Sequence, residues 1–140
     1  MSRIIVFDPA SGASGDMILG ALLDAGAPLS AMQEAVSRLG IAGVRIRSEA
    51  VSSGAVRGTR VTIDAAPDQP TRDWQGIQQL LTDSALTEPV RAAALAVFQS
   101  LAEAEAKAHN EPIERVHFHE VGAVDAIADV VGACAGLAAL

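Results

Sequence analysis

The chain is poor in residue types on which whole classes of protein depend. It has no tyrosine, three phenylalanines and one tryptophan, and its single cysteine, Cys134, allows no internal disulfide. A domain without disulfides fits the reducing cytoplasm, where we expect this protein to be located. The shortage of aromatic residues and the many alanines indicate a core of small, closely packed side chains.

Basic residues are also scarce. Ten lysines and arginines stand against 17 aspartates and glutamates, so the formal net charge is −7. Nucleic acid requires a positive surface, so this charge argues against it as a partner. Long apolar runs are missing as well. The run at the start of the chain is too short for a signal peptide, and Asp125 and Asp129 interrupt the apolar end of the chain, which argues against a membrane span.

The patterns that are present predict a single domain over residues 1–140. A short apolar run at 3–8 predicts a buried strand, and alternation over 44–51 and 58–64 predicts a hairpin. Helical periodicity with capping residues predicts helices at 16–26, 29–40, 74–84, 87–109 and 124–140. The expected class is α/β or α+β, a layered domain in which a small mixed sheet of about three strands packs against about five helices.

Four further residues have structural interpretations. Gly20 is unfavourable inside a helix and therefore predicts close packing at that point. Trp74 is expected to anchor its short helix, and Cys134 to be a small buried apolar residue. His109 closes the long helix near Lys107, and we favour this role over a ligand role because basic side chains suit a helix C-terminus.

The stretch FDPASGASGD runs from a predicted strand through a Gly/Ser loop into a helix. Free N–H groups and the helix dipole suit an anion there, so we expect phosphate or substrate contacts from Ser11, Gly12, Ser14 and Gly15. Asp8 and Asp16 flank the loop, and a divalent cation would offset their repulsion of a phosphate. The loop lacks the lysine of a P-loop. The structural alternative is that Ser14 caps the helix and Asp16 complements its dipole.

A second polar cluster lies in RVHFHEVGAVDAIADVVG. In an extended segment His117 and His119 would share one face while Phe118 points into the core. Paired imidazoles suit Ni²⁺, Zn²⁺ or Co²⁺. The stretch therefore predicts a metal site formed by His117, His119, Glu120 and Asp125. Since H-x-H is a weak motif, surface histidines before a turn and a helix-starting aspartate remain the structural alternative.

Three stretches together resemble a known family: DPASGASGDMILGALLDAG, SLAEAEAKAH and VHFHEVGAVDAIADVVGA. They are similar to the nickel insertion proteins for the nickel-pincer cofactor of lactate racemase. The second family motif matches from Val116 to Asp125, and again at Asp129 and Gly132, with Ala126 in place of the usual serine. The first motif matches at Asp8, Ser11, Gly12, Ser14, Gly15, Asp16 and Met17. The likeness covers nearly the whole chain.

The resemblance implies insertion of nickel into pyridinium-3,5-bisthiocarboxylic acid mononucleotide, with consumption of CTP. Family members are longer, and this chain ends in an apolar run at Leu140, so we expect an N-terminal fragment whose partners include the missing C-terminal part and further copies of the chain. The CTP site, with Mg²⁺ or Mn²⁺, is then expected outside this chain. Where many members carry a histidine-rich run, this chain reads DAAPDQPTRDW. The alternative functions are a nickel-binding or chaperone module without catalysis and a structural module.

Overall fold

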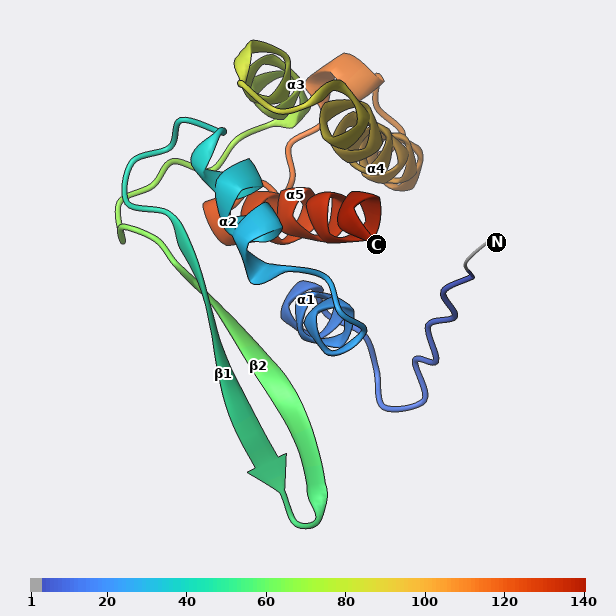
Figure 1. Cartoon of the computed structure of the whole chain (residues 1–140). Coiled ribbons are helices and arrows are strands. Elements are labelled where there is room, and N and C mark those ends of the chain that lie inside the picture. The colour runs from blue at the N-terminus through green and yellow to red at the C-terminus, as the bar shows by residue number, and fades with distance from the viewer. Residues whose placement is uncertain (1–3) are drawn as a thin grey trace.

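A computed structural model describes residues 4–140, and helices make up most of their regular structure (Figure 1). The elements in chain order are α1 (Gly15–Asp24), α2 (Leu29–Ser37), β1 (Arg45–Ser53), β2 (Val56–Asp64), α3 (Trp74–Asp83), α4 (Glu88–His109), the 3₁₀ turn η1 (Ile113–Arg115) and α5 (Val124–Ala139). All five predicted helices form. The mixed helix and strand class is confirmed, but the described sheet has two antiparallel strands rather than about three.

Helix α5 lies at the centre and packs against α1, α2 and α4 (Figure 1). Its inner faces are made of small or β-branched residues, which lets neighbouring helices approach closely. A Cβ atom at Gly132 would lie 3.0 Å from Leu19 of α1, and one at Gly136 would lie 2.5 Å from Met32 of α2. Cys134 is buried in this core, as expected from its apolar neighbours. The close packing expected of small residues is therefore present along α5, whereas other parts of the core contain large side chains such as Phe98 and Trp74.

Helix α4 is the longest helix, and it buries a single ladder of residues at i+4 spacing. The ladder consists of Val90, Ala94, Phe98 and Ala102. Helical spacing from Val90 and Ala94 would also favour burial of Val97, but Val97 is 40% exposed because Phe98 occupies the core. No helix within residues 4–140 combines the length and the apolar character needed to cross a lipid bilayer.

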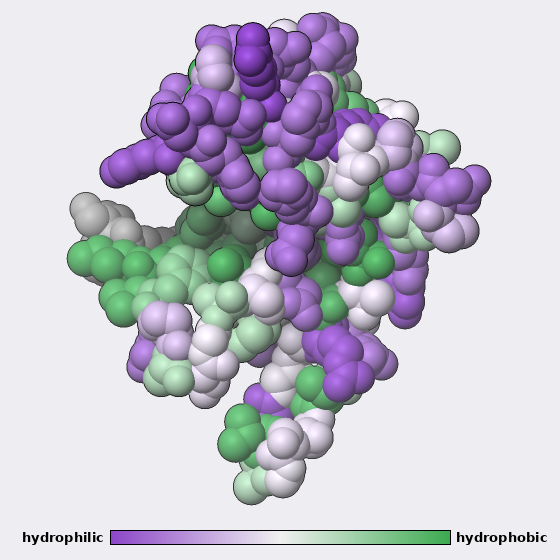
Figure 2. Space-filling view, turned by 180° about the vertical axis from the view of Figure 1, so that it is seen from behind, coloured by the Kyte–Doolittle hydropathy of each residue, from purple (hydrophilic) through white to green (hydrophobic). Residues whose placement is uncertain are grey.

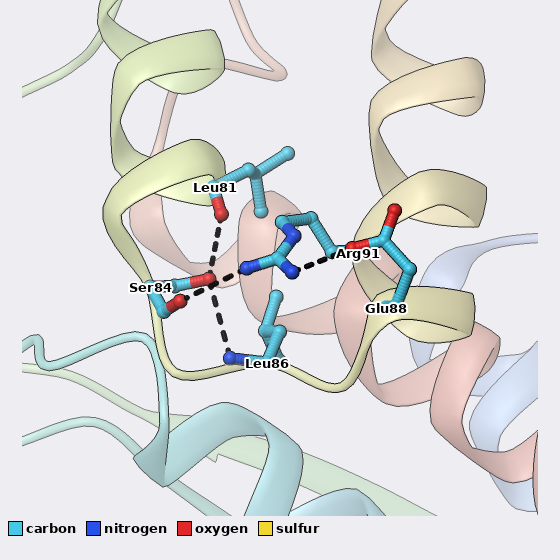
Figure 3. A network of polar contacts seen from close by, with 5 residues as sticks. All are labelled: Leu81, Ser84, Leu86, Glu88 and Arg91. Atoms are coloured by element: carbon cyan, nitrogen blue, oxygen red, sulfur yellow. Dashed lines mark hydrogen bonds and ion pairs between the residues drawn. The ribbon is translucent and has the colours of Figure 1, made fainter.

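Polar contacts fix the short connection between α3 and α4 (Figure 3). The Ser84 hydroxyl donates to the carbonyl oxygen of Leu81 at 2.7 Å, which satisfies one of the last carbonyls of α3. Arg91 of α4 donates to the Ser84 carbonyl oxygen at 3.3 Å and to the Glu88 carboxylate at 2.6 Å. The arginine thus joins the end of one helix to the first turns of the next.

The hairpin β1–β2 projects from the helical body, and its register runs from Arg45 opposite Asp64 to Ser53 opposite Val56 (Figure 1). Gly20 explains how the hairpin is attached, because a Cβ atom there would overlap the carbonyl oxygen of Thr59 in β2. The Thr59 hydroxyl also donates to the Asp24 carboxylate at 2.7 Å. The close packing predicted at Gly20 is confirmed.

The predicted buried strand at 3–8 is wrong over residues 4–8, which form no strand, while residue 3 lies outside the described part. A strand needs a neighbour to pair its N–H and C=O groups. The hairpin lies on the other side of α1 from this segment and offers it no edge (Figure 1). Ile4 and Val6 are therefore 85% and 84% exposed.

The N-terminal segment adds to an exposed apolar surface. Phe7, Met17 and Leu137 are also about half exposed, and a cavity of about 470 Å³ is lined by Ile4, Ile5, Ala25, Leu137 and Leu140. Figure 2 shows a broad apolar area on this side of the molecule. Contiguous apolar surface of this kind favours association. We define Ile4, Ile5, Val6, Phe7, Met17 and Leu137 as the apolar patch.

We expect the chain to self-associate through the apolar patch. Replacing both Ile4 and Val6 by serine should reduce the association, because it removes apolar surface without disturbing the core. Light scattering over a range of protein concentrations measures the mass. A concentration-independent monomer mass for the unsubstituted chain would show that the patch does not drive association.

Candidate functional site

The H-x-H stretch is held in place by the connector that precedes α3. The Trp74 N–H donates to the Val116 carbonyl oxygen at 3.2 Å, and the Arg72 N–H donates to the Gly122 carbonyl oxygen at 2.9 Å. Gly122 is required there, because a Cβ atom would overlap the carbonyl oxygen of Arg72. Both ends of segment 116–122 are thus hydrogen-bonded to residues 72–74.

Alternation along this segment places its histidines on the surface. Val116 and Phe118 are 1% and 5% exposed, and the Phe118 ring lies 6.3 Å from that of Phe98 in α4. His117 and His119, between and after them, are exposed. The predicted burial of Phe118 is confirmed, and both imidazoles lie at the surface of a segment that the core anchors.

His119 has a neighbour that the sequence analysis did not assign to it. Its ring centroid lies 5.4 Å from that of His109, the last residue of α4, with the planes tilted by 56°. The Nε2 atom of His109 lies 3.2 Å from Oε2 of Glu105, one helical turn earlier. The i, i+4 spacing of Glu105 and His109 was a visible signal, but their proximity to His119 depends on tertiary structure. We call these three residues the histidine cluster.

Residues 9–15, which we call the glycine loop, approach α5 at Asp129. A Cβ atom at Gly15 would overlap the Asp129 carboxylate, so glycine lets the start of α1 approach α5. Asp129 is half-buried, and its Oδ1 atom has no hydrogen-bond partner among the described residues. Burial, together with the smaller effect of the negative charges of Asp16 and Asp125, raises the pKa of Asp129 to about 6. We call Asp16, Asp125 and Asp129 the acidic cluster.

Asp129 was not among the predicted site residues. Its i+4 relation to Asp125 was visible in the sequence, but the contact with Gly15 joins positions more than 100 residues apart in the chain. The contact also explains why glycine is needed at position 15 for packing, independently of any ligand.

The remaining loop residues are exposed and locally hydrogen-bonded. Asp8 accepts from the Ala10 N–H at 3.1 Å, and the Gly12 N–H donates to the Pro9 carbonyl oxygen at 2.8 Å. Gly12 has a φ of +92°, and the space beside its Cα is open. The neighbouring Ser11 is exposed. The loop geometry therefore leaves room for a ligand at Gly12.

Ser14 and Asp16 contact each other at the start of α1. Ser14 occupies the N-cap position, but its hydroxyl donates to the Asp16 carboxylate and makes no capping hydrogen bond. The cap position is confirmed and the capping bond is not. Asp16 also lies in the first turn, where a carboxylate stabilises the helix dipole.

The predicted metal ligands are not preassembled as one group. Within residues 4–140 no three histidine, cysteine, aspartate or glutamate side chains gather closely enough to hold a metal ion. Glu120 is exposed, and Asp125 accepts from the adjacent Ala126 N–H at 2.9 Å. An ion bound here would complete its coordination with water or ligand atoms. Imidazoles suit nickel, and carboxylates suit harder cations.

Comparison with known proteins identifies one family. A model described as nickel insertion protein matches residues 5–140. A relative from Nocardioides, named pyridinium-3,5-bisthiocarboxylic acid mononucleotide nickel insertion protein, is 45% identical over 129 residues, which is 92% of this chain and 33% of the relative. No solved structure matches.

Two further relatives are named for nickel insertion. The one from Thermomicrobium roseum is 52% identical and covers 93% of this chain, and the one from Syntrophobacter fumaroxidans is 49% identical and covers 94%. The matched parts are 32% and 34% of those relatives. The chain thus spans about a third of the length of the relatives it matches.

The raised pKa of Asp129 predicts a pH-dependent stability. The ordinary pKa is 3.8 and the folded value is about 6, so the folded state binds more protons between these values and its stability falls as the pH rises through them. Asp129→Asn should therefore raise the free energy of unfolding at pH 7 by about 1–2 kcal/mol, allowing for solvent screening of a half-buried group.

Urea unfolding at pH 4.5 and pH 7 measures this difference. Asp68→Asn, in the exposed connector before α3, is the matched control and should show no such gain. An Asp129→Asn variant with the pH dependence of the unsubstituted chain would contradict the burial of a charged carboxylate.

Proposed function

The chain belongs to the nickel insertion protein family, and we propose that it takes part in inserting nickel into pyridinium-3,5-bisthiocarboxylic acid mononucleotide. The observation that carries the proposal is the placement of His117 and His119, both exposed on a segment that the core anchors. Nickel is the cargo of this reaction, so its site must be accessible and must release the ion.

The proposed nickel ligands are His117, His119, Glu120 and Asp125. Imidazole and carboxylate donors hold Ni²⁺ moderately, and the softer thiocarboxylate sulfurs of the substrate compete well for it. Absence of a preassembled group of three ligands is compatible with this role, since open positions allow the substrate to bind the ion before the protein releases it.

The glycine loop is the proposed site for the phosphate of the mononucleotide. Ser14 and Gly15 lie at the start of α1, where the helix dipole favours an anion, and Ser11 and Gly12 lie in the loop just before it. The open space at Gly12 supports approach of a ligand, whereas Gly15 contributes by letting α1 reach α5. Asp8 and Asp16 are the proposed ligands of a divalent cation, and each has one oxygen engaged within the loop.

CTP is the proposed co-substrate, with CMP and pyrophosphate as products and Mg²⁺ or Mn²⁺ as its metal. We place this step in the part of the longer relatives that this chain does not cover, because two thirds of their length lies there. The same part and further copies of the chain are the proposed partners, and the proposed location is the cytoplasm.

A nickel-binding or chaperone module without catalysis is the second candidate. The exposed histidines favour it, because they could bind nickel without a nucleotide. The two functions differ in one respect, since only the first requires the glycine loop to bind the substrate.

We expect the 140-residue chain to bind Ni²⁺ through the H-x-H stretch. A double variant, His117→Ala with His119→Ala, should lower the affinity at least tenfold, because it removes two imidazole donors. Isothermal titration calorimetry at neutral pH measures the affinity. An unchanged dissociation constant in the double variant, with the circular dichroism spectrum retained, would exclude these side chains as ligands.

We expect Gly12→Ala to weaken binding of a pyridinium mononucleotide, for which nicotinic acid mononucleotide is a probe. A φ of +92° is strained for alanine, so the loop should change shape. Gly54→Ala in the hairpin turn is the matched control, because Gly54 also has a positive φ and open space beside it. Equal affinity in both variants would favour the module without substrate binding.

A further inference from the structure

His109 has no part in the proposed nickel site, yet it lies beside one of its members. Its ring centroid is 5.4 Å from that of His119, although the two residues come from the end of α4 and from the segment before α5. The side chain of His109 is 50% exposed, so an ion in solution can reach it.

We propose that His109 and His119 hold one nickel ion between them, with Glu105 as the residue that positions His109. This inference rests on the proposed function, since it names a ligand of the same cargo site. It assigns His109 a role beyond closing α4.

The ring geometry fits a shared ion. With nitrogen–metal distances of about 2.1 Å, two imidazoles in neighbouring coordination positions have centroids roughly 4.6–5.3 Å apart. The observed separation of 5.4 Å lies close to the upper end of this range. The rings are tilted by 56° rather than stacked, so a ring nitrogen of each can turn toward a common point.

Glu105 supplies the orientation that a metal-binding histidine needs. Its carboxylate lies 3.2 Å from Nε2 of His109 and can accept the N–H of the neutral ring there. A hydrogen bond at Nε2 leaves the lone pair on Nδ1, which then becomes the metal-binding atom. The carboxylate also makes the imidazole a stronger donor.

The end of α4 is favourable for a cation. His109 is the last residue of this 22-residue helix, where the helix dipole is negative. Lys107 is also in the last turn, but it precedes His109 by two residues. This spacing places the two side chains about 200° apart around the helix axis. Its charge therefore lies on the other side of the helix.

Two preassembled protein donors are few for nickel, and this fits an ion that must be handed over. Within residues 4–140 no three metal-binding side chains are assembled around one position. Water occupies the remaining positions until sulfur atoms of the substrate replace it. A closed site with four protein ligands would retain the ion and prevent its transfer to the substrate.

The test is a nickel titration of the 140-residue chain and of single alanine variants at His109, His117 and His119. We expect His109→Ala and His119→Ala each to weaken binding at least tenfold, and the variant with both changes to be little weaker than either, because they hold the same ion. Glu105→Gln should weaken binding about tenfold through the loss of the orienting carboxylate.

Proton NMR of the unsubstituted chain provides a second measurement that no substitution affects. Paramagnetic Ni²⁺ at substoichiometric concentration should broaden the imidazole resonances of His109 and His119 together. Broadening of His119 without His109 would overturn the inference.

The outcomes also separate this inference from the proposed function. Loss of binding in His117→Ala and His119→Ala, with full affinity in His109→Ala, would overturn the role of His109 and leave the H-x-H site standing. Full affinity in all three variants would overturn both.

Discussion

The close packing of α5 against α1 is the constraint on which the candidate site depends. It requires Gly15 at the start of α1, because any side chain there would overlap Asp129. The same contact places a half-buried carboxylate beside two other acids, and burial together with their charge raises its pKa to about 6. The cost of placing these charges together is offset by the apolar core that α5 forms with its neighbours.

Two groups of polar side chains lie at different helix junctions of this scaffold. The acidic cluster lies where α1 meets α5, and the histidine cluster lies where α4 ends beside segment 116–122. Carboxylates prefer hard cations and imidazoles prefer nickel.

The apolar patch can be related to the greater length of the relatives. Residues 4–8 have the composition of a strand but no partner among the described residues, and the last helix ends at the cavity that Ile4 and Ile5 line. The relatives are about three times longer than the matched region. Further polypeptide or a second copy of the chain can cover the apolar surface that this chain exposes.

The sequence by itself determined the five helices, the hairpin and the outward orientation of His117 and His119, because periodicity and glycine placement act over short distances. It also carried the family resemblance, which the comparisons confirmed. Tertiary structure alone decided that residues 4–8 form no strand, since strand formation depends on a partner. It likewise decided that Asp129 meets Gly15 and that His109 meets His119. Local patterns predict the direction of a side chain, but its neighbours from distant segments depend on how the helices pack.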